Sequence, residues 1–566
     1  MVVYDTEQQL PEVSISGKSE FHAAPTDPPE TKKTTMDTPS LHTTEPESET
    51  DVQTTASQRR WILIATCLAL LAIMVSVSGL NVAQGALAAD LGASQSELLW
   101  IINGFTVALA ASLLPLGALG DRIGRKSVLV VGTTAFAALN VASAFADSAG
   151  LLIGLRVAMG VSAALVMPAT LSTITAAFPP EERGRAVGVW TGVAGGGGVI
   201  GLISSAIIVD NVSWPWVFAA PIGIALISLA ITIPMVPNTH ELAEGAFDRI
   251  GSLLSVLAVG GIVLAIHEGP EQGWTAAITV GAAIVGVLAL IGFVAWERRQ
   301  AAPLLDVSVF TNRVLSAGAL SLTVMFALII GMFLVMIQFL QAVLEFSAIR
   351  ASVALLPMIV VLMAVAPLAP LVSQRFGYRN TMTASLLVVA GALGWLALVP
   401  EAPTYMDVAP ALVVLGLALG VAMTPSTTAI TESLPVEKQG VASALNDTVR
   451  ELGGAIGVAV IGSILASGYR SSVADTAETL EPELAHLVEE GIGGAFVAAQ
   501  QAGPAGGEII TNAQSAFLDG WGPAMWLAAG IAAATALVAY RIIPADADAN
   551  VSPLPEHTDD RELVAA

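Results

Sequence analysis

Long apolar runs separated by short polar breaks extend over most of this chain. There are fourteen such runs, each about 18 to 27 residues long, which is the length that an α-helix needs to cross a ~30 Å hydrocarbon core. The predicted helices cover residues 61–82, 98–119, 127–146, 150–173, 186–209, 215–234, 250–267, 275–296, 315–341, 350–372, 381–400, 407–430, 441–467 and 521–541. The pattern predicts an all-α integral membrane protein with fourteen transmembrane helices.

Composition agrees with a membrane protein, since only 12% of the 566 residues are charged and the mean hydropathy is +0.74. A soluble domain carries about 25% charged residues. The net charge of −23 belongs mostly to residues 1–60, 468–520 and 542–566, and we expect the first and last of these segments to be disordered tails. No basic patch is present, which argues against a nucleic-acid partner. A single cysteine, Cys67, leaves no cysteine metal site, and we expect neither a metal nor a cofactor.

The distribution of arginine and lysine predicts the orientation. With the N-terminus in the cytoplasm, twelve basic loop residues lie inside and only Arg350 and Arg470 lie outside. The inner residues are Arg122, Arg125, Lys126, Arg183, Arg185, Arg249, Arg298, Arg299, Arg313, Arg375, Arg379 and Lys438. We therefore expect a multi-pass protein of the cell membrane with both termini in the cytoplasm and residues 468–520 outside.

The chain also repeats itself. Residues 160–201 resemble residues 416–457, which lie 256 positions later, and Arg122-Ile-Gly124 has a counterpart in Arg375-Phe-Gly377. Parallel repeats of this kind place a substrate site near the membrane midplane, between the two halves. The predicted organisation is a tail (1–60), a six-helix bundle (61–234), a linker with two inserted helices (235–314), a second six-helix bundle (315–541) with an outer hairpin (468–520), and a tail (542–566).

The loop after the second predicted helix reads Gly117-Ala-Leu-Gly-Asp121-Arg122-Ile-Gly124-Arg125-Lys126. Gly124 suits a tight turn and Gly117 permits two helices to approach closely. Asp121, at a helix end, can accept hydrogen bonds from cationic or backbone donors of a neighbouring helix, as a latch that a rocking motion would break. The alternative is a simple positive anchor at the membrane surface. The whole pattern resembles the signature loop of the major facilitator superfamily.

Further residues resemble the fourteen-helix drug:proton antiporters of that superfamily, the EmrB/QacA-like multidrug efflux transporters. Arg156, within Leu155-Arg156-Val-Ala-Met-Gly160, is similar to the intramembrane arginine motif of that group. A charge inside the bilayer is costly and marks a candidate site. The alternative is an arginine that reaches to the outer surface. Asn81 and Asn103 join Arg156 as candidates for the coupling site or the substrate cavity.

The thirteenth predicted helix supplies a second group of candidates. The resemblance extends to its start, Gly440-Val-Ala-Ser-Ala-Leu-Asn-Asp447-Thr-Val-Arg450-Glu451. With a helix beginning near residue 442, Asp447, Arg450 and Glu451 lie about 8–14 Å along it. Spacings of three and four residues put Asp447 on one face with both others, so two carboxylates share one arginine. We expect a proton-coupling site, and the alternative is a structural ion pair near the headgroups.

Two positions depart from the group's pattern. Ser76 stands where an aspartate is usual in the first helix, and Leu202 stands where the fifth-helix motif usually has proline. Gly197 and Gly201 remain and suit close helix packing. The resemblance implies proton-driven export of hydrophobic or amphiphilic small molecules by a monomer that is not an enzyme. Two alternatives are a metabolite transporter of other direction or coupling, and a non-transporting membrane sensor.

Overall fold

The computed structural model describes residues 54–238 and 247–545. Most of the two predicted tails, 1–60 and 542–566, therefore lies outside the described residues. Within the described part every helical run predicted from the sequence coincides with a helix or a row of helices, and no strand is found there. The prediction of an all-α membrane protein is confirmed.

The first half of the chain is a bundle of six helices. It comprises α1 (Ala56–Leu91), α2 (Gln95–Ile123), α3 (Arg125–Ser143), α4 (Ala149–Ala177), α5 (Pro180–Asn211) and α6 (Ala219–Met235), which follows the 3₁₀ turn η1 (Trp214–Phe218). Helix α1 packs against α5 and α6, and α4 packs against α2 and α3. These are the helices of the predicted bundle 61–234, although α1 begins earlier and ends later than expected.

The second half repeats this arrangement with more interruptions. It comprises α9 (Arg313–Gln338) with the π turn η3 (Phe339–Val343), α10 (Ala348–Ala354), α11 (Leu356–Val365), η4 (Ala366–Leu368), α12 (Ala369–Phe376), α13 (Tyr378–Leu396), α14 (Tyr405–Thr431), α15 (Gln439–Glu478) and α18 (Gly506–Ile542). The span predicted at 350–372 is found as one membrane-spanning run, Ala348–Phe376, but it is not one continuous α-helix. Prolines at 357, 367 and 370 lack the backbone N–H that a helix interior needs, so the run is divided into α10, α11, η4 and α12.

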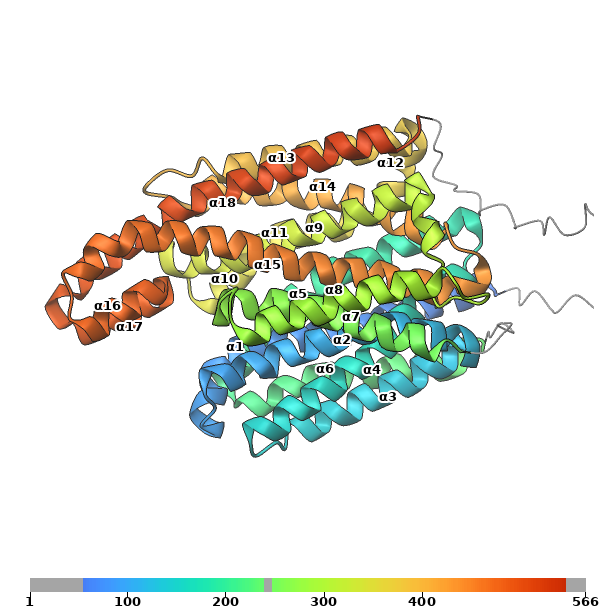
Figure 1. Ribbon diagram of the computed structural model, residues 1–566, viewed down its shortest axis with the longest axis horizontal. Helices are drawn as coiled ribbons and strands as arrows, with labels where there is room; N and C mark the ends of the chain where they lie inside the picture. The colour runs from blue at the N-terminus through green and yellow to red at the C-terminus, as the bar shows by residue number, and fades with distance from the viewer. Residues whose placement is uncertain (1–53, 239–246, 546–566) are drawn as a thin grey trace, which may run out of the picture. The chain divides into compact units, whose positions relative to one another are not determined.

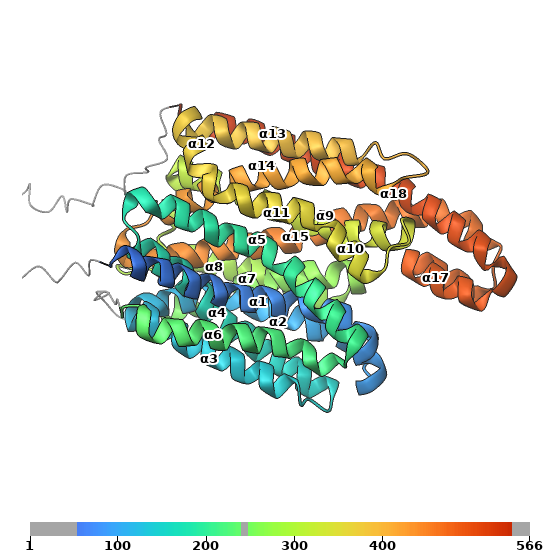
Figure 2. The ribbon, with the colours of Figure 1, turned by 180° about the vertical axis from the view of Figure 1, so that it is seen from behind.

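The two inserted helices form a hairpin that covers one seam between the halves. Helix α7 (Arg249–Gln272) packs against α2 of the first half and α15 of the second, and α8 (Ala277–Glu297) packs on α7 (Figure 1). None of the described helices covers the opposite seam in this way, and there α5 meets α11, α12 and α14 directly (Figure 2). We call this opposite contact the second seam.

Thirteen helices in the described part are long and apolar enough to cross a membrane. The fourteenth, predicted at 381–400, is α13. It is not among those thirteen, and its first turn carries the polar residues Arg379, Asn380 and Thr381. Helix α13 nevertheless packs along α14 and α18 inside the bundle, so the chain is a multi-pass membrane protein.

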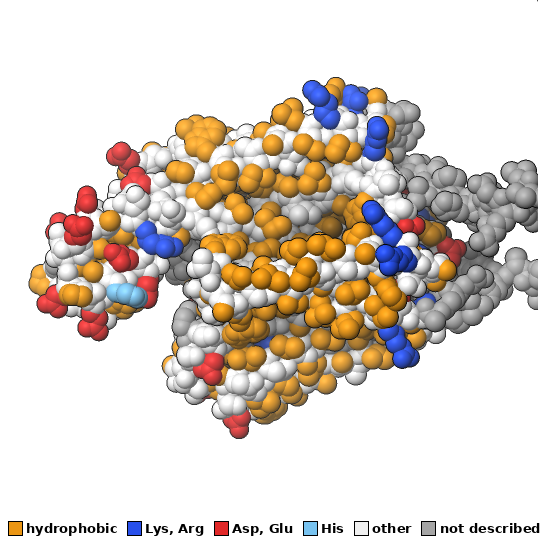
Figure 3. Space-filling view, viewed as in Figure 1, with side chains coloured by type: hydrophobic (Ala, Val, Ile, Leu, Met, Phe, Trp, Pro, Cys, Tyr) orange, Lys and Arg blue, Asp and Glu red, His pale blue; other side chains and the backbone are white. Residues whose placement is uncertain are grey.

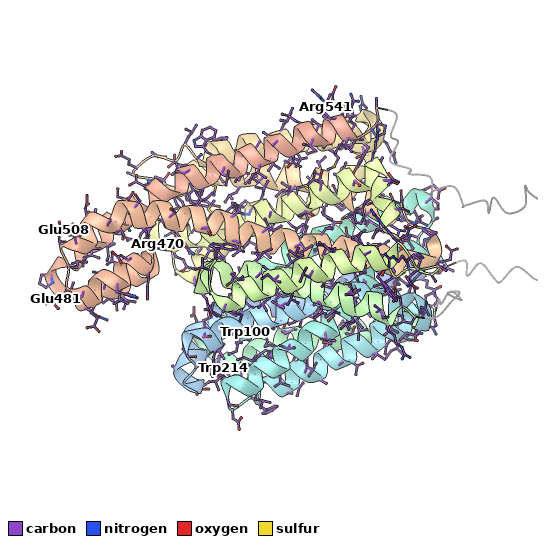
Figure 4. All side chains as sticks on the ribbon, in the orientation of Figure 1. Trp100, Trp214, Arg470, Glu481, Glu508 and Arg541 are labelled. Carbon is purple, nitrogen blue, oxygen red and sulfur yellow. The ribbon has the colours of Figure 1, made fainter. Side chains whose placement is uncertain are left out.

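Charged side chains separate to the two ends of the bundle. On the face shown in Figure 3, most arginines and lysines gather at one end and the acidic side chains gather mainly at the other. Arg541 lies at the first end, and Glu481 and Glu508 lie at the second (Figure 4). We call them the basic end and the hairpin end.

The hairpin end is built differently from the expectation. The predicted helices 441–467 and 521–541 are too short, because α15 and α18 continue well past the bundle. Two short helices, α16 (Pro482–Glu490) and α17 (Ile492–Gln501), connect them and fold back. The helix α15 continues beyond the apolar run because contacts with the hairpin stabilise it. Tyr469 and Val473 stay buried there, and the Tyr469 hydroxyl donates to the Val488 carbonyl at 3.0 Å.

Candidate functional site

A carboxylate of the first half holds the start of a helix of the second half at the basic end. Asp121, near the end of α2, accepts hydrogen bonds from the backbone N–H of Gly440 at 2.8 Å and of Val441 at 3.2 Å. These N–H groups belong to the first turn of α15, where helical N–H groups have no partner within their own helix. A carboxylate is favourable there also because of the helix dipole. We call this contact the latch.

The local sequence explains why those two N–H groups are available. The 3₁₀ turn η5 (Val436–Lys438) precedes α15, so the α-helix begins only at Gln439. The Gln439 side chain in turn donates to the Thr431 carbonyl at 2.8 Å, which fixes the start of α15 against the end of α14. A Cβ atom on Gly117 would lie 2.6 Å from the Gly440 carbonyl oxygen, so α2 and α15 meet backbone to backbone.

Some of the other residues of the predicted loop also lie at the latch, and one does not. Gly124 has φ +100° and turns the chain from α2 into α3, a conformation that glycine favours. Arg125 is buried, with its Nε 3.7 Å from Asp121 Oδ1. Arg122 instead lies over the ring of Phe247, 5.5 Å from its centroid. The structure thus brings Gly117, Asp121, Gly124 and Arg125 together and directs Arg122 toward the linker.

Arg156 lies in the interior of the first half. Its side chain is 0% exposed, its Nε donates to the Ile101 carbonyl at 2.9 Å, and its Nη1 donates to the Ser76 carbonyl at 3.4 Å. The guanidinium stacks over Phe105, with 4.4 Å from Cζ to the ring centroid. The alternative in which Arg156 reaches the outer surface is therefore wrong, because α4 directs it into the bundle. Among the described residues no carboxylate lies within ion-pair distance of it.

The departure at Ser76 is located beside this arginine. Ser76 offers its backbone carbonyl to Arg156, while its hydroxyl lies 3.4 Å from Asn140 Oδ1. Asn103 is half-buried on α2, two residues beyond the Ile101 carbonyl, and Asn81 is exposed near the hairpin end of α1. Asn103 is therefore two residues from the carbonyl that Arg156 contacts, and among the described residues no hydrogen bond joins Arg156 to Asn103 or Asn81.

The third group lies where the two halves meet. Asp447 is fully buried and its Oδ1 pairs with Arg450 Nη1 at 3.1 Å. The Arg450 guanidinium lies between two rings, Trp190 of α5 at 5.1 Å and Phe326 of α9 at 4.5 Å. These rings come from different halves. Asp447 Oδ2 has no hydrogen-bond partner among the described residues.

Two details of this group differ from the sequence prediction. Because α15 begins at Gln439 rather than near 442, Asp447 and Glu451 lie about 12 and 18 Å along it. Glu451 is half-buried and forms no ion pair within the described part of the chain, so Arg450 is paired with Asp447 alone. The sequence also gave no indication of Trp190 and Phe326, since single aromatic residues in apolar runs look like ordinary core.

The predicted packing glycines lie in helix contacts. A Cβ on Gly197 would be 2.7 Å from Met74 Cβ, and one on Gly201 would be 2.8 Å from Val75 Cα, both where α5 crosses α1. The equivalent glycines of the repeat, Gly453 and Gly457, lie against α9 in the same manner. Leu202 is buried. In the range that the structure describes, no three His, Cys, Asp or Glu side chains are grouped to hold a metal ion.

Two repeated six-helix halves, a latch between them and a buried ion pair at their interface define a class of membrane transporters. The family model of the Major Facilitator Superfamily matches residues 64–458. The chain belongs to this superfamily, as the sequence predicted.

Named relatives agree with the multidrug efflux group. The chain is 32% identical over 483 residues to the multidrug efflux pump LfrA of Mycolicibacterium smegmatis, covering 85% of this chain and 95% of LfrA. It is 31% identical over 502 residues to the tetracenomycin C resistance and export protein of Streptomyces glaucescens, covering 87% and 93%. Among solved structures, the human organic anion transporter MFSD10 has a TM-score of 0.56 at 13% identity, covering 86% of this chain and 99% of that one, which shows the shared fold.

Proposed function

We propose that this protein exports amphiphilic small molecules from the cell and that inward proton flow drives the export. The names of its relatives, a multidrug efflux pump and a resistance and export protein, support this direction of transport. We place the basic end in the cytoplasm, because arginine and lysine are retained on that side. Both termini are then cytoplasmic and the α16–α17 hairpin is outside.

The observation that carries the proposal is the position of the Asp447–Arg450 pair. Arg450 contacts a ring from each half, so a rocking of the halves changes the surroundings of the pair. Conversely, a proton on Asp447 removes the negative charge that binds Arg450 and releases the guanidinium. Proton binding and rocking therefore influence each other through the same side chains.

The energy of such coupling is sufficient for export. One charge crossing the membrane supplies ~2.3 kcal/mol per 100 mV, which corresponds to about a fiftyfold concentration ratio. The latch belongs to the arrangement in which the cytoplasmic side is closed, since Asp121 joins the two halves there. Opening toward the cytoplasm requires that these hydrogen bonds break. We propose that the protein performs this cycle as a monomer.

The test is transport by purified protein in proteoliposomes with an imposed pH gradient. Fluorescent amphiphiles of positive, neutral and negative charge are compared as substrates. Asp447→Asn and Glu451→Gln are measured separately and together, with Asp475→Asn, an exposed acid on the same helix, as the matched control. We expect the double variant to lose the dependence of transport on the gradient and the control to keep it.

Two outcomes would contradict parts of the proposal. If the double variant still responds to the gradient as the wild type does, Asp447 and Glu451 are not the coupling site. Arg156 or the substrate itself would then be the better candidate. Movement of every tested amphiphile with the proton rather than against it would favour the uptake transporter, and no movement at all would favour the membrane sensor.

A further inference from the structure

The second seam contains the repeat counterpart of the latch, but its chemistry is different. The spacing that aligns Arg122-Ile-Gly124 with Arg375-Phe-Gly377 aligns Asp121 with Gln374 and Arg125 with Tyr378. The carboxylate and the guanidinium of the first half are thus replaced by an amide and a phenol. This position therefore has neither the carboxylate acceptor of the latch nor the ion pair that Asp121 forms with Arg125.

The residue of the facing helix α5 that corresponds to Gly440 also offers no free backbone donor. Gly184 is the repeat counterpart of Gly440, but α5 begins at Pro180, so Gly184 lies beyond the first four residues and its N–H is directed to its own helix. Pro370 takes the place of Gly117, and a Cβ on Gly184 would meet the Pro370 ring at 3.2 Å. The two helices touch here through a proline ring rather than backbone to backbone.

A cavity of about 630 Å³ occupies this part of the second seam. Ligand pockets for small molecules are commonly about 300–1,000 Å³. The wall from the first half is the start of α5, and the wall from the second half comes from η4, α12, the starts of α9 and α13, and the end of α14. Pro367, Leu371 and Pro425 supply an apolar surface.

A polar group without a partner lines the same cavity. Ser373 is 2% exposed, and its hydroxyl makes no hydrogen bond with a described residue. The Tyr378 hydroxyl, in contrast, is directed toward Ser426. A buried hydroxyl normally has a partner, so the Ser373 hydroxyl in the cavity wall indicates a place for a polar ligand group. Glu432, directly after α14, adds a half-buried carboxyl.

We propose that this cavity binds a small apolar amine from the cytoplasm and that the bound amine favours the closed cytoplasmic side. The apolar body lies against the prolines and Leu371, and the ammonium group lies at Glu432. Because the cavity is formed by both halves together, a ligand that fills it binds the closed arrangement better than the open one. Such a ligand shifts the equilibrium toward closure.

The electrostatics of the site favour a cation at Glu432. Burial raises the pKa of the Glu432 carboxyl to about 7, and the nearby Arg183 opposes this effect only in part. The other ionisable groups that line the cavity are Glu181, Arg185 and Tyr378. Glu181 and Arg185 are both exposed and of opposite charge, so they offset each other. An ammonium group therefore gains most from the Glu432 carboxylate.

The experiment compares three compounds that share one apolar body, namely 1-aminoadamantane, 1-adamantanol and 1-adamantanecarboxylate. Binding to the purified full-length protein in nanodiscs is measured by calorimetry. We expect the amine to bind about tenfold more tightly than the alcohol or the acid, as a charged hydrogen bond provides. Glu432→Gln should remove this preference, and Glu437→Gln, a nearby exposed acid outside the cavity, should keep it.

Two further readouts test the same site. The primary amine stays protonated between about pH 6 and pH 8. Its affinity for the wild type should therefore rise over that range as Glu432 ionises, whereas the affinity of Glu432→Gln should stay constant. The amine should also slow hydrogen exchange at the start of α5 in the wild type only. Equal binding of the three compounds, or an unchanged preference in Glu432→Gln, would overturn the proposal whether or not the protein exports amphiphiles.

Discussion

Replacing Asp121 by asparagine tests the latch with the smallest change of shape. The carboxylate accepts two backbone N–H bonds from α15 in a site where Asp121 is only 5% exposed. A hydrogen bond to a charged group contributes about 1.5–3 kcal/mol and a neutral one about 0.5–1.5 kcal/mol. Asparagine keeps only one acceptor oxygen. Its NH₂ group replaces the second oxygen and faces a backbone N–H, so one of the two hydrogen bonds is lost.

We therefore expect Asp121→Asn to destabilise the closed cytoplasmic side by about 2–3 kcal/mol relative to the open one. At 1.4 kcal/mol per factor of ten, the ratio of closed to open protein falls about thirty- to over a hundredfold. Transport should fall strongly because the cycle stays open on that side, while folding and membrane insertion are retained.

Spin labels on Ile123 and Glu437 measure this ratio, because both residues are exposed and lie on either side of the latch, Ile123 at the end of α2 and Glu437 within η5. In a cysteine-free background, Asp121→Asn should add a population with a longer distance between the labels. Asp147→Asn, an exposed aspartate in the loop between α3 and α4, is the control and should leave the distances unchanged. An unchanged distance distribution together with normal transport in Asp121→Asn would refute the latch and leave the loop as a surface anchor.

Three other predictions follow from the same geometry. Single cysteines at Gln300 and Glu490 should react with an impermeant thiol reagent from opposite sides of the membrane, and equal reaction from outside would overturn the orientation. Gly440→Ala should weaken closure as the latch variant does, because its Cβ would lie 2.7 Å from the latch carboxylate oxygen, and it should do so in the same spin-label assay. Arg156→Lys should reduce transport about tenfold with normal expression, since an ammonium lacks the planar fork that reaches two carbonyls and stacks on a ring; full transport would remove Arg156 from the mechanism.

The helices were largely predictable because a bilayer allows few alternatives to apolar helices about 20 residues long. The ends of α15 and α18 were not, since past the bundle the helix is maintained by contacts such as that of Tyr469 with Val488, which hydropathy does not contain. The breaks between α10 and α12 occur at prolines, which are visible in the sequence. The prediction of one span from hydropathy does not take these prolines into account.

For each contact of the candidate site, the sequence predicts the charged residue but not its partner. Asp121 stands out in the sequence as an acid at a helix end, but its partners are backbone N–H groups of Gly440 and Val441, which have no sequence signature of their own. Likewise Arg450 is visible as a charge in an apolar helix. Its ring neighbours Trp190 and Phe326 come from two different halves and become neighbours only through the tertiary fold.

The continuous helix α15 extends from the latch at the basic end to the hairpin end. Its 40 residues span about 60 Å, so a rigid tilt of about 10° around its centre displaces each tip by about 5 Å in opposite directions. One tip carries Gly440 and the other carries the α16–α17 hairpin, to which Tyr469 is bonded. If α15 tilts as a rigid body, its tip at the basic end and the hairpin move in opposite directions, so we expect the position of the hairpin to change when the latch opens.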